Sequence, residues 1–184
     1  MKKSFDTLQI TFLAACIAMG LVSKRFISPI TNILTDFIRL PGGSASAGFA
    51  IMFLALGCSV TEYPLAGTFA GLAQGILALT MGMSGYQGIF AVISYAVPGI
   101  VIDVVRKIVK KRTEGYFIIA CCLGNVLGAV VSNFLTFHFT SFLLLMWLLV
   151  AASFGCLGGM LGSITAERME GLYEFRRMKR CIRN

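Results

Sequence analysis

Side chains able to bind a small polar molecule gather in three connecting segments of an otherwise apolar sequence. The segments are KRFISPITNILTDFIRLPGGSA at 24–45, MGMSGYQG at 81–88 and NFLTFHFTS at 133–141. Together with aromatic residues in the neighbouring apolar stretches, they supply hydrogen-bond donors, acceptors and ring faces suited to a small heterocycle. The candidate substrate-binding residues are Asn32, Asp36, Arg39, Tyr86, Gln87, Tyr95, Asn133, His138 and Trp147.

Each of these residues also has a purely structural interpretation. Tyr86 and Trp147 suit the aromatic belt at a membrane surface as well as a ligand site, and His138 suits a lipid headgroup as well as a ligand. Deeper in the apolar stretches, Asn125 and Gln74 are expected to hydrogen-bond a neighbouring helix. Convergence of several polar groups on one face is the stronger indication, and it predicts a pocket that opens on that face.

Catalytic chemistry has few candidates in this sequence. His138 is the only histidine, which excludes a site that needs two imidazoles. Asp103 is expected to cap a helix or to pair with Arg106 or Lys107 rather than to relay protons. The run GCLGGMLGS at 155–163 lacks the lysine of a phosphate-binding loop, and the six cysteines contain no CxxC pair. We expect no enzyme activity, no cofactor and no metal.

The elements that must position these residues are membrane spans. Hydrophobic residues make up 57% of the chain, charged residues 13%, and the mean hydropathy is +0.84, far from the roughly 25% charged residues of soluble proteins. The predicted fold is an all-α integral membrane protein, a six-helix bundle at 1–165 followed by a basic tail at 166–184. The predicted spans are 8–23, 46–60, 65–82, 86–104, 116–137 and 141–165, near the roughly 20 residues that cross a hydrocarbon core.

Basic residues set the predicted orientation of these spans. Lys2, Lys3, the cluster at 106–112 and the basic residues of the tail fall on one side, whereas Lys24, Arg25 and Arg39 fall on the other. Because cytoplasmic loops carry the excess of lysine and arginine, both termini are predicted to be cytoplasmic and the three polar segments to lie outside. The long outer connection at 24–45 has a length typical of lids and binding elements. The net charge of +8 needs no nucleic acid to explain it.

Small residues line several of the predicted helix faces. Glycines recur at intervals of four at 67, 71 and 75, at 124 and 128, and at 155, 158, 159 and 162, which predicts close helix packing. In TFLAACIAMG, at 11–20, Ala14, Ala15 and Ala18 form a similar face where leucine would bury more apolar surface. Such a face suits a partner helix that approaches closely.

The AxxxA element at Ala14 and Ala18 occurs together with six short spans, cytoplasmic ends and a long first outer loop. In this combination the chain resembles the substrate-binding S component of an energy-coupling factor (ECF) transporter, a class that imports vitamins and related micronutrients. The middle of the chain, YPLAGTFAGLAQGILALTMGMSGYQG at 63–88, is similar to the thiamin-related YkoE-type S components.

The resemblance implies capture of the substrate from outside, in a bacterial or archaeal cell (inner) membrane. It also implies docking through Ala14, Ala15 and Ala18 on a transmembrane coupling subunit, with ATP hydrolysis by two ATPase subunits. The substrate it suggests is thiamin or a precursor, with a ring stacked on aromatic residues and its positive charge facing Asp36. The rival functions are a membrane-embedded enzyme, such as a lipid-modifying transferase, and a small channel or scaffold bundle. Against a channel, no predicted span has a polar stripe from end to end.

Overall fold

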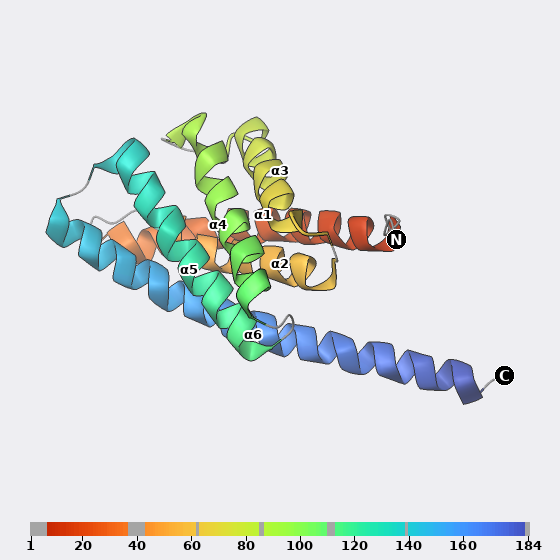
Figure 1. Cartoon of the computed structure of the whole chain (residues 1–184). Helices are drawn as coiled ribbons and strands as arrows, with labels where there is room; N and C mark the ends of the chain where they lie inside the picture. Colours follow the sequence, from red (N-terminus) through yellow and green to blue (C-terminus); the bar gives the residue numbers. More distant parts are fainter. Residues whose placement is uncertain are drawn as a thin grey trace.

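The computed structural model describes residues 7–36, 43–61, 63–84, 87–109, 113–138 and 140–182 (Figure 1). At 34–36 and 170–182 it describes the helix but not the side chains. These residues contain helices and no strand, which confirms the all-α prediction. The helices are α1 (Thr7–Asp36), α2 (Gly43–Val60), α3 (Ala66–Thr80), α4 (Phe90–Ile108), α5 (Glu114–Ser132) and α6 (Ser141–Ile182), with a π-helical turn, η2 (Asn133–Phe137), after α5.

Four helices are long and apolar enough to cross a membrane. Their candidate spans are Gln9–Ile33, Gly43–Val60, Glu114–Thr136 and Ser141–Met169. α3 is apolar but has 15 residues, and α4 carries charged residues near its end. Large apolar side chains cover the outside of the helices, including Phe69, Ile93 and Leu145. Such a surface suits lipid rather than water, so the chain is a membrane protein.

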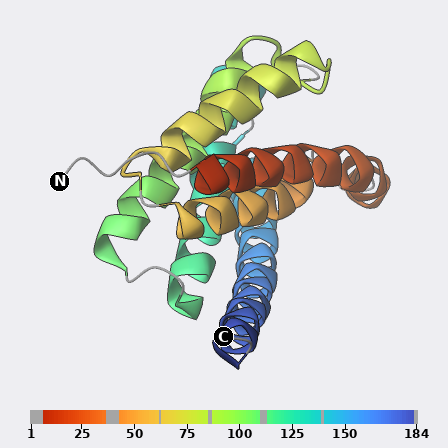
Figure 2. The same ribbon diagram turned by 90° about the vertical axis from the view of Figure 1, so that its right-hand side faces the viewer.

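α2 lies at the centre of the bundle. It packs against α1, α5 and α6, and 72% of its span is buried, compared with 17% of the span in α1. α3 and α4 pack on each other, and α4 also packs against α5. Figure 2 shows α1 alongside α2, with the α3 and α4 pair covering one side of them. The most exposed of the long helices is therefore α1.

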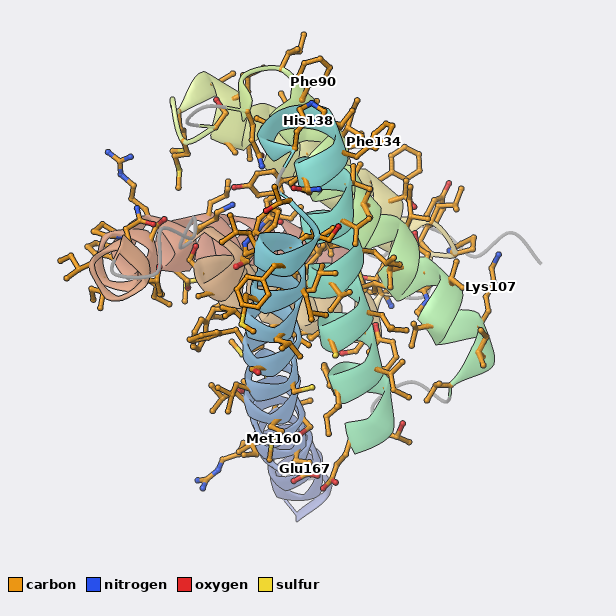
Figure 3. All side chains as sticks on the ribbon, turned by 90° about the vertical axis from the view of Figure 1, so that its left-hand side faces the viewer. Phe90, Lys107, Phe134, His138, Met160 and Glu167 are labelled. Carbon is orange, nitrogen blue, oxygen red and sulfur yellow. The ribbon has the colours of Figure 1, made fainter. Side chains whose placement is uncertain are left out.

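The two ends of the bundle are distinguished in Figure 3. Residues at one end are Phe90, Phe134 and His138, and residues toward the other are Lys107, Met160 and Glu167. We call these the Phe90 end and the Lys107 end. The start of α1 and the end of α6 lie on the same side of Figure 1.

The predicted outer loop at 24–45 is largely helical, and this prediction is therefore wrong. α1 ends only at Asp36, and α2 begins at Gly43. The apolar residues Phe26, Ile30 and Ile33 continue the helix at spacings of three and four and are exposed, as lipid-facing residues are. The shorter connection between the two helices, 37–42, lies outside the described residues.

The helix passes through Pro29 without ending. Proline has no N–H and normally breaks a helix in water, but in a membrane nearby hydroxyl groups can satisfy the carbonyls that it frees. The hydroxyl of Thr31 donates to the carbonyls of Ile27 and Ser28 at 3.2 and 3.0 Å. These bonds do not replace the one lost at Pro29, whose missing N–H would have bound the carbonyl of Arg25. The helix nevertheless continues, as membrane helices tolerate an internal proline, and its apolar residues remain exposed on both sides of Pro29.

α6 also extends beyond its predicted span. It continues from Ser141 to Ile182 as one helix, and Figure 1 shows its last turns projecting past the bundle. The sequence at 166–182 is rich in Glu, Arg, Met and Lys, which are good helix formers. The tail predicted at 166–184 is therefore a continuation of the sixth helix as far as Ile182.

Rows of glycine bring helix backbones into contact, as the spacing predicted. The row on α3 (Gly67, Gly71 and Gly75) faces α4, and Gly155 and Gly159 of α6 face α5. A Cβ atom on Gly71 would lie 2.7 Å from the carbonyl oxygen of Tyr95. Close approach of this kind is how helices associate where burial of apolar surface gives no advantage over lipid.

A methyl group added to the α3–α4 contact should destabilise the bundle. A Cβ atom on Gly99 would lie 2.8 Å from the carbonyl carbon of Gly67, and backbone cannot rotate away as a side chain can. We expect Gly99→Ala to lower the free energy of unfolding by about 1–3 kcal/mol, the usual cost of overpacking. Thermal unfolding in detergent measures the loss.

Gly115→Ala is the matched control for this substitution. Gly115 is in the first turn of α5, and no atom lies within 4 Å of the position of its Cβ. The control should keep or slightly raise the melting temperature, because alanine favours helix over glycine. Equal melting temperatures for the two variants would contradict the close α3–α4 contact.

Candidate functional site

A polar cluster at the Lys107 end centres on Asp103, which is 4% exposed. Its Oδ1 accepts the backbone N–H of Gly67 at 3.0 Å, and its Oδ2 accepts the N–H and the hydroxyl of Thr68, both at 2.7 Å. These are the first residues of α3, whose positive helix-dipole end favours a carboxylate. Asp103 is therefore a helix cap, one of the two structural roles predicted for it.

Arg106, one turn further along α4, binds the end of a different helix. Its Nη1 donates to the carbonyls of Cys58 and Thr61 at 3.1 and 3.2 Å, and its Nη2 donates to the carbonyl of Tyr63. These carbonyls lie at and just beyond the end of α2, where the helix dipole favours a cation. Asp103 and Arg106 thus fix the α2–α3 turn from both sides, through hydrogen bonds to the start of α3 and to the end of α2.

A second cluster, near the Phe90 end, places a lysine against a buried tyrosine. Nζ of Lys24 on α1 donates to the hydroxyl of Tyr95 on α4 at 2.6 Å and lies 4.2 Å from the centre of its ring. Tyr95 is 9% exposed. A lysine near the end of a membrane helix ordinarily extends toward water, whereas Lys24 reaches inward to a partner on another helix.

Lys24 also lines an open depression of about 220 Å³. The other lining residues are Arg25, Ser28, Pro29, Asn32 and Met83. Five of the six belong to the second half of α1, where spacings of three and four place them on one face, and Met83 belongs to the turn after α3. We call this depression, with the Lys24 and Tyr95 pair, the Lys24 cleft.

Gln74 lies deeper in the same helix interface. A Cβ atom on Gly20, one turn before Lys24 on α1, would lie 2.6 Å from Nε2 of Gln74, which is 2% exposed. This Nε2 has no hydrogen-bond partner within the part of the chain that the structure describes, so the expected bond from it to a neighbouring helix is absent there. A buried amide without a partner costs about 1–3 kcal/mol, and a bound ligand or water would remove that cost.

Two of the predicted binding residues, Asn32 and Tyr95, belong to the Lys24 cleft. Asn133 and His138 lie apart from it, at the junction of α5 and α6. The carbonyl of Asn133 accepts the N–H of His138 at 2.8 Å, and His138 is exposed with a left-handed φ of 49°. Gln87 lies in the turn before α4, where its N–H donates to the carbonyl of Ser84 at 3.1 Å.

Trp147 is buried between helices, and its indole is 3% exposed. Its Nε1 donates to the hydroxyl of Ser44 at 2.9 Å. Asn125 donates to the carbonyls of Ser44 and Ala151 at 2.9 and 2.8 Å, as expected for a buried amide. These bonds join α2, α5 and α6, so Trp147 is placed inside the bundle and not in an aromatic belt.

The remaining candidates are not placed by the structure. Arg39 and Tyr86 lie outside the described residues, and Asp36 is described as the last residue of α1 without its side chain. Sequence reasoning did not select Lys24, Arg25 or Gln74 as site residues. The available signal was the position of two adjacent basic residues, Lys24 and Arg25, on the predicted outer side, where such residues are disfavoured.

Removal of the charge of Asp103 should loosen the start of α3. In Asp103→Asn, an amide nitrogen would face one of the buried N–H donors of Gly67 or Thr68. We expect a loss of about 1–3 kcal/mol in the free energy of unfolding, measured by thermal unfolding in detergent. Glu114→Gln changes an exposed acid in the first turn of α5 and should cost less than about 1 kcal/mol. Equal losses would contradict the capping role of Asp103.

Comparisons with protein families, with curated proteins and with solved structures found no match for this chain. Among the described residues, no group of three or more His, Cys, Asp or Glu side chains is placed to hold a metal ion. Function is therefore inferred from the chemistry of the Lys24 cleft and from the exposed surfaces of the helices.

Proposed function

We propose that this protein is the substrate-capture subunit, the S component, of an ECF-type importer for a vitamin or related micronutrient. The observation that carries the proposal is the Lys24 cleft, an open polar depression at one end of an apolar helical bundle. Its polar groups come from α1 and, through the hydroxyl of Tyr95, from α4, as in a site that more than one helix builds.

In this proposal all six helices cross the membrane, and the Phe90 end faces outward. The positive residues at 2–3, 106–112 and 168–183 are then cytoplasmic, in agreement with the excess of basic residues in cytoplasmic loops. The start of α1 and the end of α6 lie on one side of Figure 1, which is consistent with two cytoplasmic termini. The Lys24 cleft then opens toward the outside of the bacterial or archaeal cell (inner) membrane.

Docking on the coupling subunit would use the small-residue face of α1. Ala14, Ala15 and Ala18 are all exposed, whereas the glycine rows of α3 and α6 are buried against other helices. Small residues that no helix of this chain covers leave room for the close approach of another helix. ATP hydrolysis would belong to the two ATPase subunits of the assembled transporter.

The rival proposal of a membrane-embedded enzyme loses its main candidate residue in this structure. Such an enzyme needs a reactive carboxylate or histidine group at a membrane face, and Asp103 was the acidic residue beside a span end. Both of its oxygens accept hydrogen bonds from the start of α3. The carboxylate is therefore already bound to the backbone of α3 and is only 4% exposed.

Capture of a substrate by the isolated protein is the direct test of this proposal. The protein is purified alone in detergent, and its melting temperature is followed against vitamins and their precursors, thiamin included. A ligand present at 1,000 times its dissociation constant should stabilise the folded state by about 4 kcal/mol. If no member of the panel raises the melting temperature and no coupling subunit co-purifies, the proposal fails.

Enlarging the small face of α1 should prevent docking without affecting capture. We expect the double variant Ala14→Leu and Ala18→Leu to fold and to bind substrate, but to lose co-purification with the coupling and ATPase subunits when all are co-expressed. The control is Ser153→Leu with Thr165→Leu, two small exposed residues of α6. Loss of co-purification in both double variants, or in neither, would contradict docking through this face of α1.

A further inference from the structure

Among its described residues, the Lys24 cleft contains an excess of hydrogen-bond donors over acceptors. Lys24 and Arg25 carry positive charge and cannot accept a hydrogen bond. Asn32 and Ser28 supply both donors and acceptors, and Asp and Glu are absent from the described lining. A ligand that completes such a site must itself supply acceptors, and preferably a negative charge.

The geometry of the Lys24 and Tyr95 pair preserves this donor capacity. The tyrosine hydroxyl accepts from Nζ of Lys24 at 2.6 Å, so its own hydrogen stays available for an acceptor. The ammonium group keeps two further N–H donors, while its contact with the ring face, 4.2 Å from the centre, stabilises the cation. Three donors thus lie within one small volume, an arrangement complementary to the two oxygens of a carboxylate.

The location of Lys24 and Arg25 is also unfavourable unless a negatively charged group compensates for it. In the proposed orientation both residues lie at the outer end of α1, where the distribution of basic residues in membrane proteins disfavours them. Lys24 is half-buried and gives up part of its hydration to contact Tyr95. An anionic ligand would offset that desolvation, because an opposite charge is worth more away from water.

The size of the depression limits the ligand. Its volume of about 220 Å³ is below the roughly 300–1,000 Å³ of pockets that hold drug-sized molecules. Gln74 Nε2 lies about one helical turn deeper along α1, against Gly20. A single ring that bears a carboxylate would meet Lys24 and Tyr95 with its charged end.

We propose that the Lys24 cleft selects a small ring compound that carries a carboxylate. Lys24 and the hydroxyl of Tyr95 hold the carboxylate, and Arg25 at the rim attracts it. The inference rests on the proposed capture function and names the substrate class for that same site. It is opposed to a cationic ligand facing Asp36, which the resemblance to thiamin-related components suggests.

Matched pairs of probes test this selection. Nicotinate is compared with nicotinamide, and 4-aminobenzoate with 4-aminobenzamide, since each pair differs in the charged group alone; thiamin is the cationic probe. Binding is measured on the full chain in detergent by the shift in melting temperature and by titration calorimetry. We expect at least one carboxylate to bind about 10- to 100-fold more tightly than its amide, the range for hydrogen bonds to a charged group.

Substitutions then locate the effect in the cleft. Lys24→Gln should remove most of the preference for carboxylate over amide, and Lys24→Arg, which keeps the charge, should retain part of it. Tyr95→Phe keeps the ring but removes the hydroxyl, and should weaken carboxylate binding about 3- to 10-fold. Lys107→Gln removes the same charge from an exposed position at the other end of the bundle and should change nothing.

The outcomes separate this inference from the proposed function. Tight binding of thiamin or of a neutral probe, with no preference for carboxylates, overturns the inference and leaves capture intact. A carboxylate preference that survives Lys24→Gln in a variant with an unchanged melting temperature also overturns it. The absence of binding by every carboxylate overturns it as well, and the broader vitamin panel then decides whether capture itself fails.

Discussion

The structure depends on the satisfaction of helix ends by two oppositely charged residues of α4. Water is absent from the interior of a membrane bundle, so each unpaired N–H or carbonyl group at a helix end is costly. Asp103 binds the first N–H groups of α3, and Arg106 binds the last carbonyls of α2. One helix thereby fixes the position of the two before it. A charge inside a membrane protein is often functional, but the hydrogen bonds of Asp103 and Arg106 to helix ends give this pair a structural role.

The position of α4 relative to α3, which the Asp103 cap sets at one end, also determines the contacts at the Phe90 end of the bundle. From the cap, the glycine row of α3 lies against α4 at Gly99, Tyr95 and Val92 in turn. Because the two backbones are in contact, α4 cannot slide or rotate without a clash. Tyr95 is therefore held at a defined place two turns from Asp103, facing α1. The inward position of Lys24 follows from this arrangement, since the tyrosine hydroxyl gives the ammonium a partner within the bundle.

The polar groups of the interior differ in how completely they are bonded. Asp103, Arg106 and Asn125 each make two or more hydrogen bonds to groups at helix ends or on neighbouring helices. Gln74, against Gly20 on α1, keeps an amide nitrogen without a partner within the described chain. Nζ of Lys24, one turn further along α1, donates to the hydroxyl of Tyr95 and has three donors in all. Incomplete bonding in a buried place is destabilising in the absence of ligand. Of these groups, Lys24 lines an open depression, so a small molecule that enters it can reach the ammonium group.

The sequence by itself determined the class of the molecule, because composition and apolar spacing are local properties. An all-α membrane protein, the glycine rows at helix contacts and a structural role for Asp103, as either a cap or an ion pair, could be inferred from residue types and intervals alone. The loop assigned to 24–45 was wrong because polar and charged residues were taken as the end of the first span, whereas α1 continues through Lys24, Arg25 and Pro29 to Asp36. Only the tertiary structure decided which polar residues meet. Asn32 and Tyr95 share a cleft with Lys24, while Trp147 is used against Ser44 and His138 lies elsewhere at the same end. Convergence depends on the rotation of each helix about its axis, and that rotation is set by contacts between residues far apart in the sequence.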